Sequence, residues 1–248
     1  MSGAPAAAGA DHPSRNEMIE FERSAAGPIV VRLDRPPVNA LDLELVQAIT
    51  AAIARAIGER GPAIVLTGAG RCFSAGIDTK VVPTYTEQQR RTAIGAINTM
   101  VSTVYAAPVP VVAALNGHAL GGGLVLALAC DRRIASTGHY RLALNEVMAG
   151  VPFPAGPLAV VRAELDAPVV RDLCLTGRAI GPEEALALRV VDELAEPAQL
   201  LEAALARAAQ LASPRVYETV KRQFRGPVAE RLERIASSGD DPLLRGSR

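Results

Sequence analysis

The fold of this chain is decided by two glycine-containing stretches, Phe73-Ser74-Ala75-Gly76-Ile77-Asp78 and Asn116-Gly117-His118-Ala119-Leu120-Gly121-Gly122-Gly123. The first lies a few residues after the apolar run 63–67, and the second directly follows the run 110–115; both runs are typical of buried strands. Glycines after a strand allow tight packing, bind phosphate, or offer backbone N–H groups to a developing negative charge. Either stretch alone is equally well explained as a bend.

The residues around these glycines argue against a nucleotide-phosphate site. A P-loop requires Gly-Lys followed by Ser or Thr, and neither Gly121-Gly122-Gly123-Leu124 nor Gly68-Ala69-Gly70-Arg71 provides it. A dinucleotide-binding fingerprint fails as well, because Phe73 stands where the third glycine belongs. Tight packing and anion stabilisation remain as explanations.

Composition narrows the class of protein. The chain has 248 residues, of which 49% are hydrophobic, enough for one large domain or two small ones. Its net charge is zero and it has no basic stripe with aromatic residues, which argues against a nucleic-acid partner. The three cysteines are far apart, so we expect neither a disulfide framework nor a metal site, and a reducing cytoplasm fits best. No apolar run is long enough to span a membrane.

The order of apolar segments predicts an α/β fold. Strands are expected at 29–33, 63–67 and 110–115, with helices beginning at Asp42 and after Thr86. Thr86-Glu87-Gln88-Gln89 matches a capping box. We expect a loop at 71–80, a helix at 124–129, and short strands at 132–135 and 140–144.

The chain becomes mainly helical beyond Pro152. Helices are expected at 183–188, 200–211 and 214–224. We therefore predict a disordered tail at 1–16, an α/β core at 17–195 and a helical region at 196–248. The tail is not a secretory signal, and a transit peptide is the alternative for it.

Taken together, the two glycine stretches closely resemble the paired loops of the crotonase (enoyl-CoA hydratase/isomerase) family. Further matching stretches run nearly the whole length of the chain: Arg35-Pro36, Asn39-Ala40-Leu41, Ala129-Cys130-Asp131, Leu175-Thr176-Gly177-Arg178 and Glu183-Glu184-Ala185. The resemblance implies a crotonase-type ββα spiral core with a helical C-terminal region for oligomerisation, in a homotrimer or homohexamer. It also implies an acyl-CoA thioester as substrate, with coenzyme A as part of the substrate and no other cofactor.

The resemblance implies specific site residues. The oxyanion hole would be formed by the backbone N–H groups of Ile77 and Gly122. Proton removal next to a thioester places charge on the carbonyl oxygen, and each fixed donor stabilises that charge by about 3 kcal/mol. Other matching positions would line the coenzyme A cavity, largely through the main chain: Val38, Ala40, Ala75 and Asp78.

The acid–base residues separate the reactions of this family. Hydratases of the family use two glutamates, and the first of these positions is Val125 here, which cannot transfer a proton. The second is Glu146, so the pattern resembles the single-glutamate Δ3,Δ2-enoyl-CoA isomerases. A lone base next to an oxyanion hole can move a proton between C2 and C4. We expect Glu146 to lie in an apolar pocket with a raised pKa, with Val151 and Phe153 as walls.

Two other functions stay open. The chain could be a hydratase or lyase that uses Glu146 alone or with His118, although His118 is more simply explained by packing. It could also be an acyl-CoA-binding protein with little turnover. Cys72 and Cys130 are expected to be buried and unreactive, because neither has a base at a fixed spacing.

Two stretches depart from the family pattern. The loop 150–157 contains three prolines, which stiffen it and alter the pocket, so the acyl chain stays unassigned. After Asp241 the usual basic helix is replaced by the stretch 242–248. Arg71, Arg225 and Arg245 are the candidates for binding the coenzyme A phosphate.

Overall fold

The chain forms two sheets through which it passes alternately, and the computed structural model describes residues 18–25, 27–239 and 241–245. The predicted tail at 1–16 lies outside these residues. The larger sheet contains β1 (Ile19–Arg23), β2 (Ile29–Leu33), β3 (Ile64–Gly68), β5 (Val111–Leu115), β7 (Arg132–Ser136) and β10 (Glu193–Ala195). The smaller sheet contains β4 (Cys72–Ser74), β6 (His118–Leu120), β8 (Leu142–Ala143) and β9 (Ala179–Ile180).

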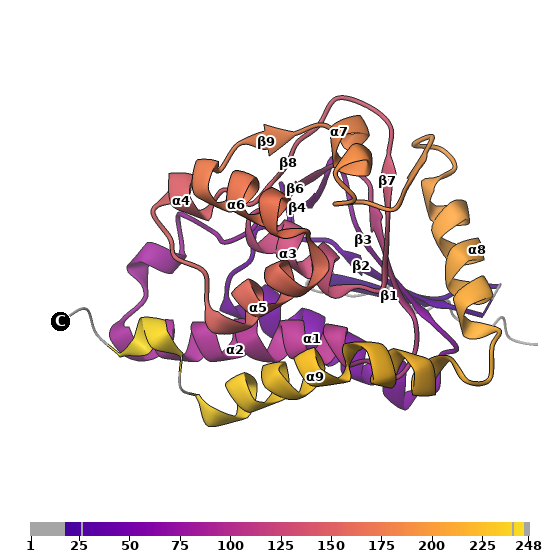
Figure 1. Ribbon diagram of the computed structural model, residues 1–248, viewed down its shortest axis with the longest axis horizontal. Coiled ribbons are helices and arrows are strands. Elements are labelled where there is room, and N and C mark those ends of the chain that lie inside the picture. The colour runs from indigo at the N-terminus through magenta and orange to yellow at the C-terminus, as the bar shows by residue number, and fades with distance from the viewer. Residues whose placement is uncertain (1–17, 26, 240, 246–248) are drawn as a thin grey trace, which may run out of the picture.

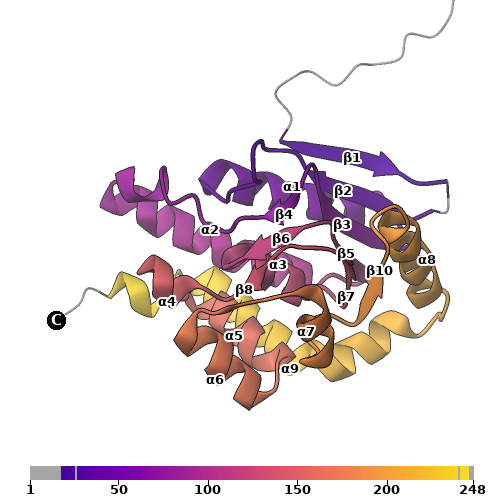
Figure 2. The same ribbon diagram turned by 90° about the horizontal axis from the view of Figure 1, so that it is seen from above.

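The sheet order reveals a spiral. Strands β3, β5 and β7 are parallel neighbours in the larger sheet, and each is followed by a strand of the smaller sheet, β4, β6 or β8. Helices α2 (Glu87–Tyr105) and α3 (Gly122–Ala129) return the chain to the larger sheet. This repeat confirms the predicted ββα spiral core, and Figure 2 shows its successive turns side by side.

Helices cover both faces of the larger sheet. The other helical elements are α1 (Leu43–Gly58), α4 (Glu146–Ala149), α5 (Ala155–Glu164), α6 (Ala167–Thr176), α7 (Pro182–Ala187), α8 (Leu200–Ala212), α9 (Tyr217–Ser238) and the 3-10 turns η1 (Val82–Thr84) and η2 (Pro242–Leu244). The main core lies between the sheet and α1 to α3, and α8 buries a second cluster on the opposite face (Figure 1). None of the described helices is long and apolar enough to cross a membrane.

The predicted helix starts are confirmed by their caps. Asp42 accepts a hydrogen bond from the N–H of Leu45 at 2.9 Å, which satisfies one of the free donors at the start of α1. Thr86 and Gln89 form the reciprocal hydrogen bonds of a capping box at the start of α2.

Short strands escaped the sequence analysis. The prediction of a loop throughout 71–80 is wrong, because Cys72–Ser74 forms β4, and β6 at His118–Leu120 was likewise not foreseen. Three residues are too few to display an alternating pattern, and β4 is buried throughout.

The C-terminal helices are more extensive than the pattern indicated. Helices α5 and α6 were not delimited, and α9 continues well beyond the expected end at 224. Gly226-Pro227 looks like a helix end, but Pro227 lies on the exposed side of α9 while Leu232 is buried against the core. Helix α9 packs on α2 and α5. The domain boundary at 195/196 and the role of 196–248 in oligomerisation stay predictions.

Candidate active site

The segment 38–41 and the first glycine loop pair through their backbones. The N–H of Ala75 donates to the carbonyl of Val38 at 3.0 Å, and the N–H of Leu41 donates to the carbonyl of Gly76 at 2.7 Å. The N–H of Asp78 returns a hydrogen bond to the carbonyl of Leu41 at 2.9 Å. This ladder fixes the backbone on both sides of Ile77, and the N–H of Ile77 has no hydrogen-bond acceptor among the described residues.

The two glycine loops lie against each other with no room for side chains. A Cβ on Gly123 would lie 2.4 Å from the carbonyl oxygen of Ser74, and a Cβ on Gly76 would lie 3.2 Å from the amide nitrogen of Gly122. Gly122 is the first residue of α3, so its N–H has no acceptor within the helix. The glycines therefore bring two unsatisfied backbone donors, those of Ile77 and Gly122, to the same place.

Glu146 meets these donors at one narrow cavity of about 20 Å³. Ile77, Gly122, Val125 and Glu146 all contribute to its wall, and Glu146 is its only acidic or basic residue. The second glycine loop also touches the carboxylate, since a Cβ on Gly121 would lie 3.4 Å from Glu146 Oε1. The sequence-predicted donors and base are thus together.

Glu146 is largely buried. The residue begins α4 and is only 8% exposed, and its Oε2 atom has no hydrogen-bond partner within the described structure. Burial raises the pKa of Glu146 to about 7, as expected from the sequence, because the charged form loses its hydration. A carboxyl group with this pKa can both accept and return a proton near neutral pH.

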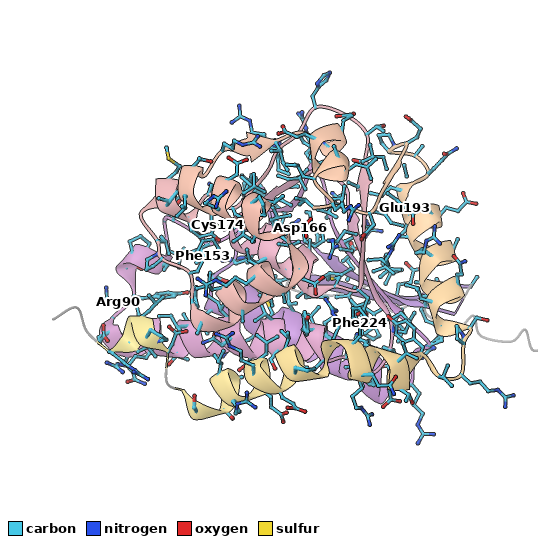
Figure 3. The ribbon with its side chains drawn as sticks, in the orientation of Figure 1. Arg90, Phe153, Asp166, Cys174, Glu193 and Phe224 are labelled. Atoms are coloured by element: carbon cyan, nitrogen blue, oxygen red, sulfur yellow. The ribbon has the colours of Figure 1, made fainter. Side chains whose placement is uncertain are left out.

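Two larger cavities share lining residues with the narrow one, and a third shares none. One of about 210 Å³ shares Leu41, Ile77, Ile97, Pro152 and Pro154 with the narrow cavity. A second of about 820 Å³ reaches Glu146 from the side of α4 and α6, where Figure 3 shows Phe153 and Cys174, but neither Ile77 nor Gly122 lines it. The expected wall residues divide accordingly: Val151 lines both larger cavities, whereas Phe153 lines only the 820 Å³ one.

The third cavity, of about 630 Å³, contains two of the residues that the resemblance assigns to coenzyme A binding. Val38 and Ala75 line it, together with Cys72, His118, Leu120, His139, Tyr140 and Arg141. Ala40 and Asp78 line none of these four cavities. The Asp78 carboxylate accepts from the N–H groups of Lys80 and Val81 at 2.9 and 3.0 Å, which fixes the turn after the first glycine loop.

His118 and the cysteines do not join Glu146. His118 accepts a hydrogen bond through Nδ1 from the N–H of Arg141 at 3.1 Å, in a different cavity from the carboxylate. Burial raises the pKa of Cys72 to about 11 and that of Cys130 to about 12, so both thiols are protonated at neutral pH. Both cysteines are buried and free, as expected. The described residues contain no cluster suited to a metal ion.

Arg225 was a candidate for the coenzyme A phosphate and is occupied elsewhere. Its guanidinium binds Asp131 at 2.7 Å and Glu164 at 2.6 Å and stacks over the ring of Tyr105. Lys221 also pairs with Asp131, at 2.7 Å. This buried network joins α9 to the core. Arg141, which the sequence analysis did not single out, is the arginine that lines the same cavity as Val38 and Ala75.

The sequence model for enoyl-CoA hydratase/isomerase matches residues 23–241. The chain belongs to the enoyl-CoA hydratase/isomerase family. It is 36% identical over 215 residues to a probable enoyl-CoA hydratase of Mycobacterium avium, covering 84% of this chain and 83% of that protein.

Solved structures agree with the family fold. A Mycobacterium tuberculosis protein, named an enoyl-CoA isomerase in one structure and a probable enoyl-CoA hydratase in another, superposes with a TM-score of 0.82 at 26% identity, covering 90% of this chain and 97% of that one. Human mitochondrial Δ3-Δ2-enoyl-CoA isomerase superposes with a TM-score of 0.84 at 24% identity, covering 90% and 88%. The second likeness concerns the fold alone. The protein is therefore an enzyme of a family that acts on acyl-CoA substrates.

Proposed function

We propose that this protein is an enoyl-CoA isomerase, which moves a double bond from C3–C4 to C2–C3 of an acyl-CoA. The observation that carries the proposal is the narrow cavity in which Glu146 is the only ionisable residue and Val125 occupies the neighbouring wall. One base is sufficient to shift a double bond, whereas water addition benefits from a second group that positions the water.

The thioester oxygen would lie between two backbone donors. The N–H groups of Ile77 and Gly122 have no acceptors of their own among the described residues, and both residues line the cavity that contains Glu146. Donors that are fixed in advance stabilise the enolate oxygen without reorganising, and each is worth about 3 kcal/mol in the transition state.

Glu146 would carry the proton. The carboxylate takes a proton from C2, and the electrons of the C2–H bond move into the thioester to form a dienolate. The protonated carboxyl then gives the same proton to C4 as the electrons return and the C2–C3 double bond forms. Charge and atoms balance without water or a separate cofactor, and the raised pKa of Glu146 suits both steps.

The coenzyme A portion would occupy the 630 Å³ cavity beside Val38 and Ala75. Ala40 and Asp78 would contribute through the backbone ladder that shapes this entrance rather than through their side chains. Arg141 is well suited to a phosphate group because guanidinium groups bind phosphate oxygens in pairs.

One alternative function has specific support, and a second is separated by the same experiment. The Mycobacterium avium relative is named a probable hydratase, and water addition with Glu146 alone is the corresponding reaction. A protein that binds acyl-CoA with little turnover is the other. Phe153 and Glu146 line the same cavity of about 820 Å³, and a role for Phe153 in substrate contact is part of the proposal. Assembly as a homotrimer or homohexamer and a cytoplasmic location stay predictions.

Product analysis separates the three functions. The purified protein is given a 3-enoyl-CoA and, separately, a 2-enoyl-CoA, and the conjugated and 3-hydroxy products are quantified. Rapid conjugation with little hydration supports the isomerase, and predominant hydration contradicts it. Thermal protection by acyl-CoA without any product would identify a binding protein.

A further inference from the structure

The C-terminal turn η2 closes the 210 Å³ cavity that adjoins the narrow one. Leu243 in this turn lines the cavity together with Ile77 and Pro152. In Figure 1 the turn is the yellow segment beside the first part of α2, and Figure 3 shows Arg90 of that helix close to it. Residues from the last turn of the chain thus reach the vicinity of Glu146.

A buried carboxylate holds this turn in place. Asp241 is 1% exposed, and its Oδ2 atom accepts from Asn98 Nδ2 at 3.0 Å and from the N–H of Ala155 at 2.7 Å. Its Oδ1 atom accepts from the N–H of Leu243 at 3.0 Å. Asn98 also accepts from the N–H of Gly156 at 2.9 Å. One side chain therefore connects the turn, α2 and the start of α5.

The cavity wall is mainly apolar. Its other members are almost all aliphatic, and its two charged residues are already paired. Asp42 pairs with Arg35, and Arg90 pairs with Glu87 at 3.3 Å. An ionised or hydroxylated group in this cavity would lose its hydration without a replacement partner.

We infer that this cavity receives the end of the acyl chain, and that Leu243 sets its length. The substrates are therefore unsubstituted acyl chains of short to medium length. This inference rests on the proposed function. At about 30 Å³ for a group the size of water, a cavity of about 210 Å³ holds about seven such groups beyond the reacting carbons. About seven groups beyond the four carbons C1 to C4 place the optimum at about eleven carbons. Asp241 acts as a positioning residue for the turn.

A chain-length series tests the inference. Turnover of 3-enoyl-CoAs from six to sixteen carbons is measured, together with the Kd of the matching saturated acyl-CoAs. Affinity is expected to improve about fourfold per methylene up to about eleven carbons and then to stop improving. Equal improvement through sixteen carbons overturns the inference.

Variants of the turn make the test specific. Leu243→Ala enlarges the cavity and is expected to lengthen the optimal acyl chain by at least about two carbons. Leu243→Trp fills part of the cavity and is expected to shorten the optimal chain. Asp241→Ala removes the hydrogen bonds that hold the turn and is expected to lengthen the optimal acyl chain, as Leu243→Ala does. Leu244→Ala is the matched control, since Leu244 is in the same turn but does not line the cavity, and it keeps the wild-type profile.

The outcomes distinguish the proposed isomerase function from the assignment of the acyl chain to the 210 Å³ cavity. If no chain length is isomerised but the Kd profile still responds to Leu243, the proposed function fails and the inference stands. If isomerisation occurs but the profile ignores Leu243, the acyl chain enters elsewhere, such as the 820 Å³ cavity beside Phe153, and the inference fails.

Discussion

Gly76 lies so close to Leu120 that a Cβ on Gly76 would sit 2.4 Å from the carbonyl oxygen of Leu120. This contact joins the two loops whose N–H groups are proposed to hold the thioester oxygen. Both partners at the contact are backbone, so neither can move aside as a flexible side chain could. The distance between the two donors therefore depends on the absence of a side chain at Gly76.

Gly76→Ala is expected to lower kcat at least about a hundredfold, which is the loss associated with removing one oxyanion donor. Gly70→Ala is the matched control, because both glycines have positive φ, 76° and 67°, but a Cβ on Gly70 would meet no atom within 4 Å. The control should cost about 1–2 kcal/mol of stability and retain activity. Turnover and thermal unfolding of both variants provide the measurement, and an active Gly76→Ala would contradict the packing argument.

Glu146→Gln is expected to stabilise the free protein at alkaline pH. Because burial raises the pKa of Glu146 from 4.5 to about 7, the folded state binds more protons than the unfolded state between these values. Stability therefore falls as pH rises through this window and stays lower above it, by up to about 3 kcal/mol. Glu146→Gln avoids this loss of stability because the amide does not ionise.

Denaturant unfolding at pH 8 and at pH 4.5 measures the effect. Glu146→Gln should exceed the wild type at pH 8 and match it at pH 4.5. Glu233→Gln, on the exposed side of α9, should show no such difference. An advantage of Glu146→Gln that does not change with pH would show that the carboxylate is not desolvated.

Val125→Glu is expected to raise the ratio of hydration to isomerisation about a hundredfold, the lower range for a positioned acid–base group. Val125 is 1% exposed and shares the narrow cavity with Glu146, so the new carboxyl would lie beside the old one. Two neighbouring carboxylates resist ionising together, which raises one pKa and supplies the second proton carrier. Product analysis with a 2-enoyl-CoA tests this, with Val125→Leu as the control that should add no hydration.

Arg225→Ala is expected to destabilise the protein by about 3 kcal/mol without weakening acyl-CoA binding by the folded protein. It removes the partner of two buried carboxylates, those of Asp131 and Glu164. Arg222→Ala in the same helix is the control, because the Arg222 side chain is 74% exposed and its ion pair with Glu218 contributes less than about 1 kcal/mol. Normal stability with weakened binding would instead assign Arg225 to the coenzyme A phosphate.

The two glycine loops could be located from the sequence, whereas the burial and the long-range partners of the residues around them could not. The glycines at 76 and 122 stand in local patterns, but either pattern alone fits a bend equally well. The donor roles of Ile77 and Gly122 came from the family resemblance. Glu146 required the family resemblance, since nothing near it in the sequence marks it as buried. The partners of Arg225, Glu164 and Asp131, lie more than sixty residues away along the chain. No local sequence pattern predicts such pairs.

The same limit applies to the acyl cavity. Asp241 binds Asn98 across 143 residues, so the closing role of the C-terminal turn emerges only from the folded structure. The sequence analysis treated that turn as a missing phosphate-binding helix. In the structure it forms a wall of the cavity next to Ile77.

The proposed isomerisation depends above all on Glu146 as the group that carries the proton from C2 to C4. The most direct measurement is the rate at which Glu146→Gln conjugates an eight-carbon 3-enoyl-CoA, with the Kd of the saturated acyl-CoA determined in parallel. We expect kcat to fall by about 10² to 10⁴ while Kd stays within about twofold, since the amide keeps the shape but cannot accept the proton. A variant that retains more than about a tenth of the wild-type rate would contradict the account.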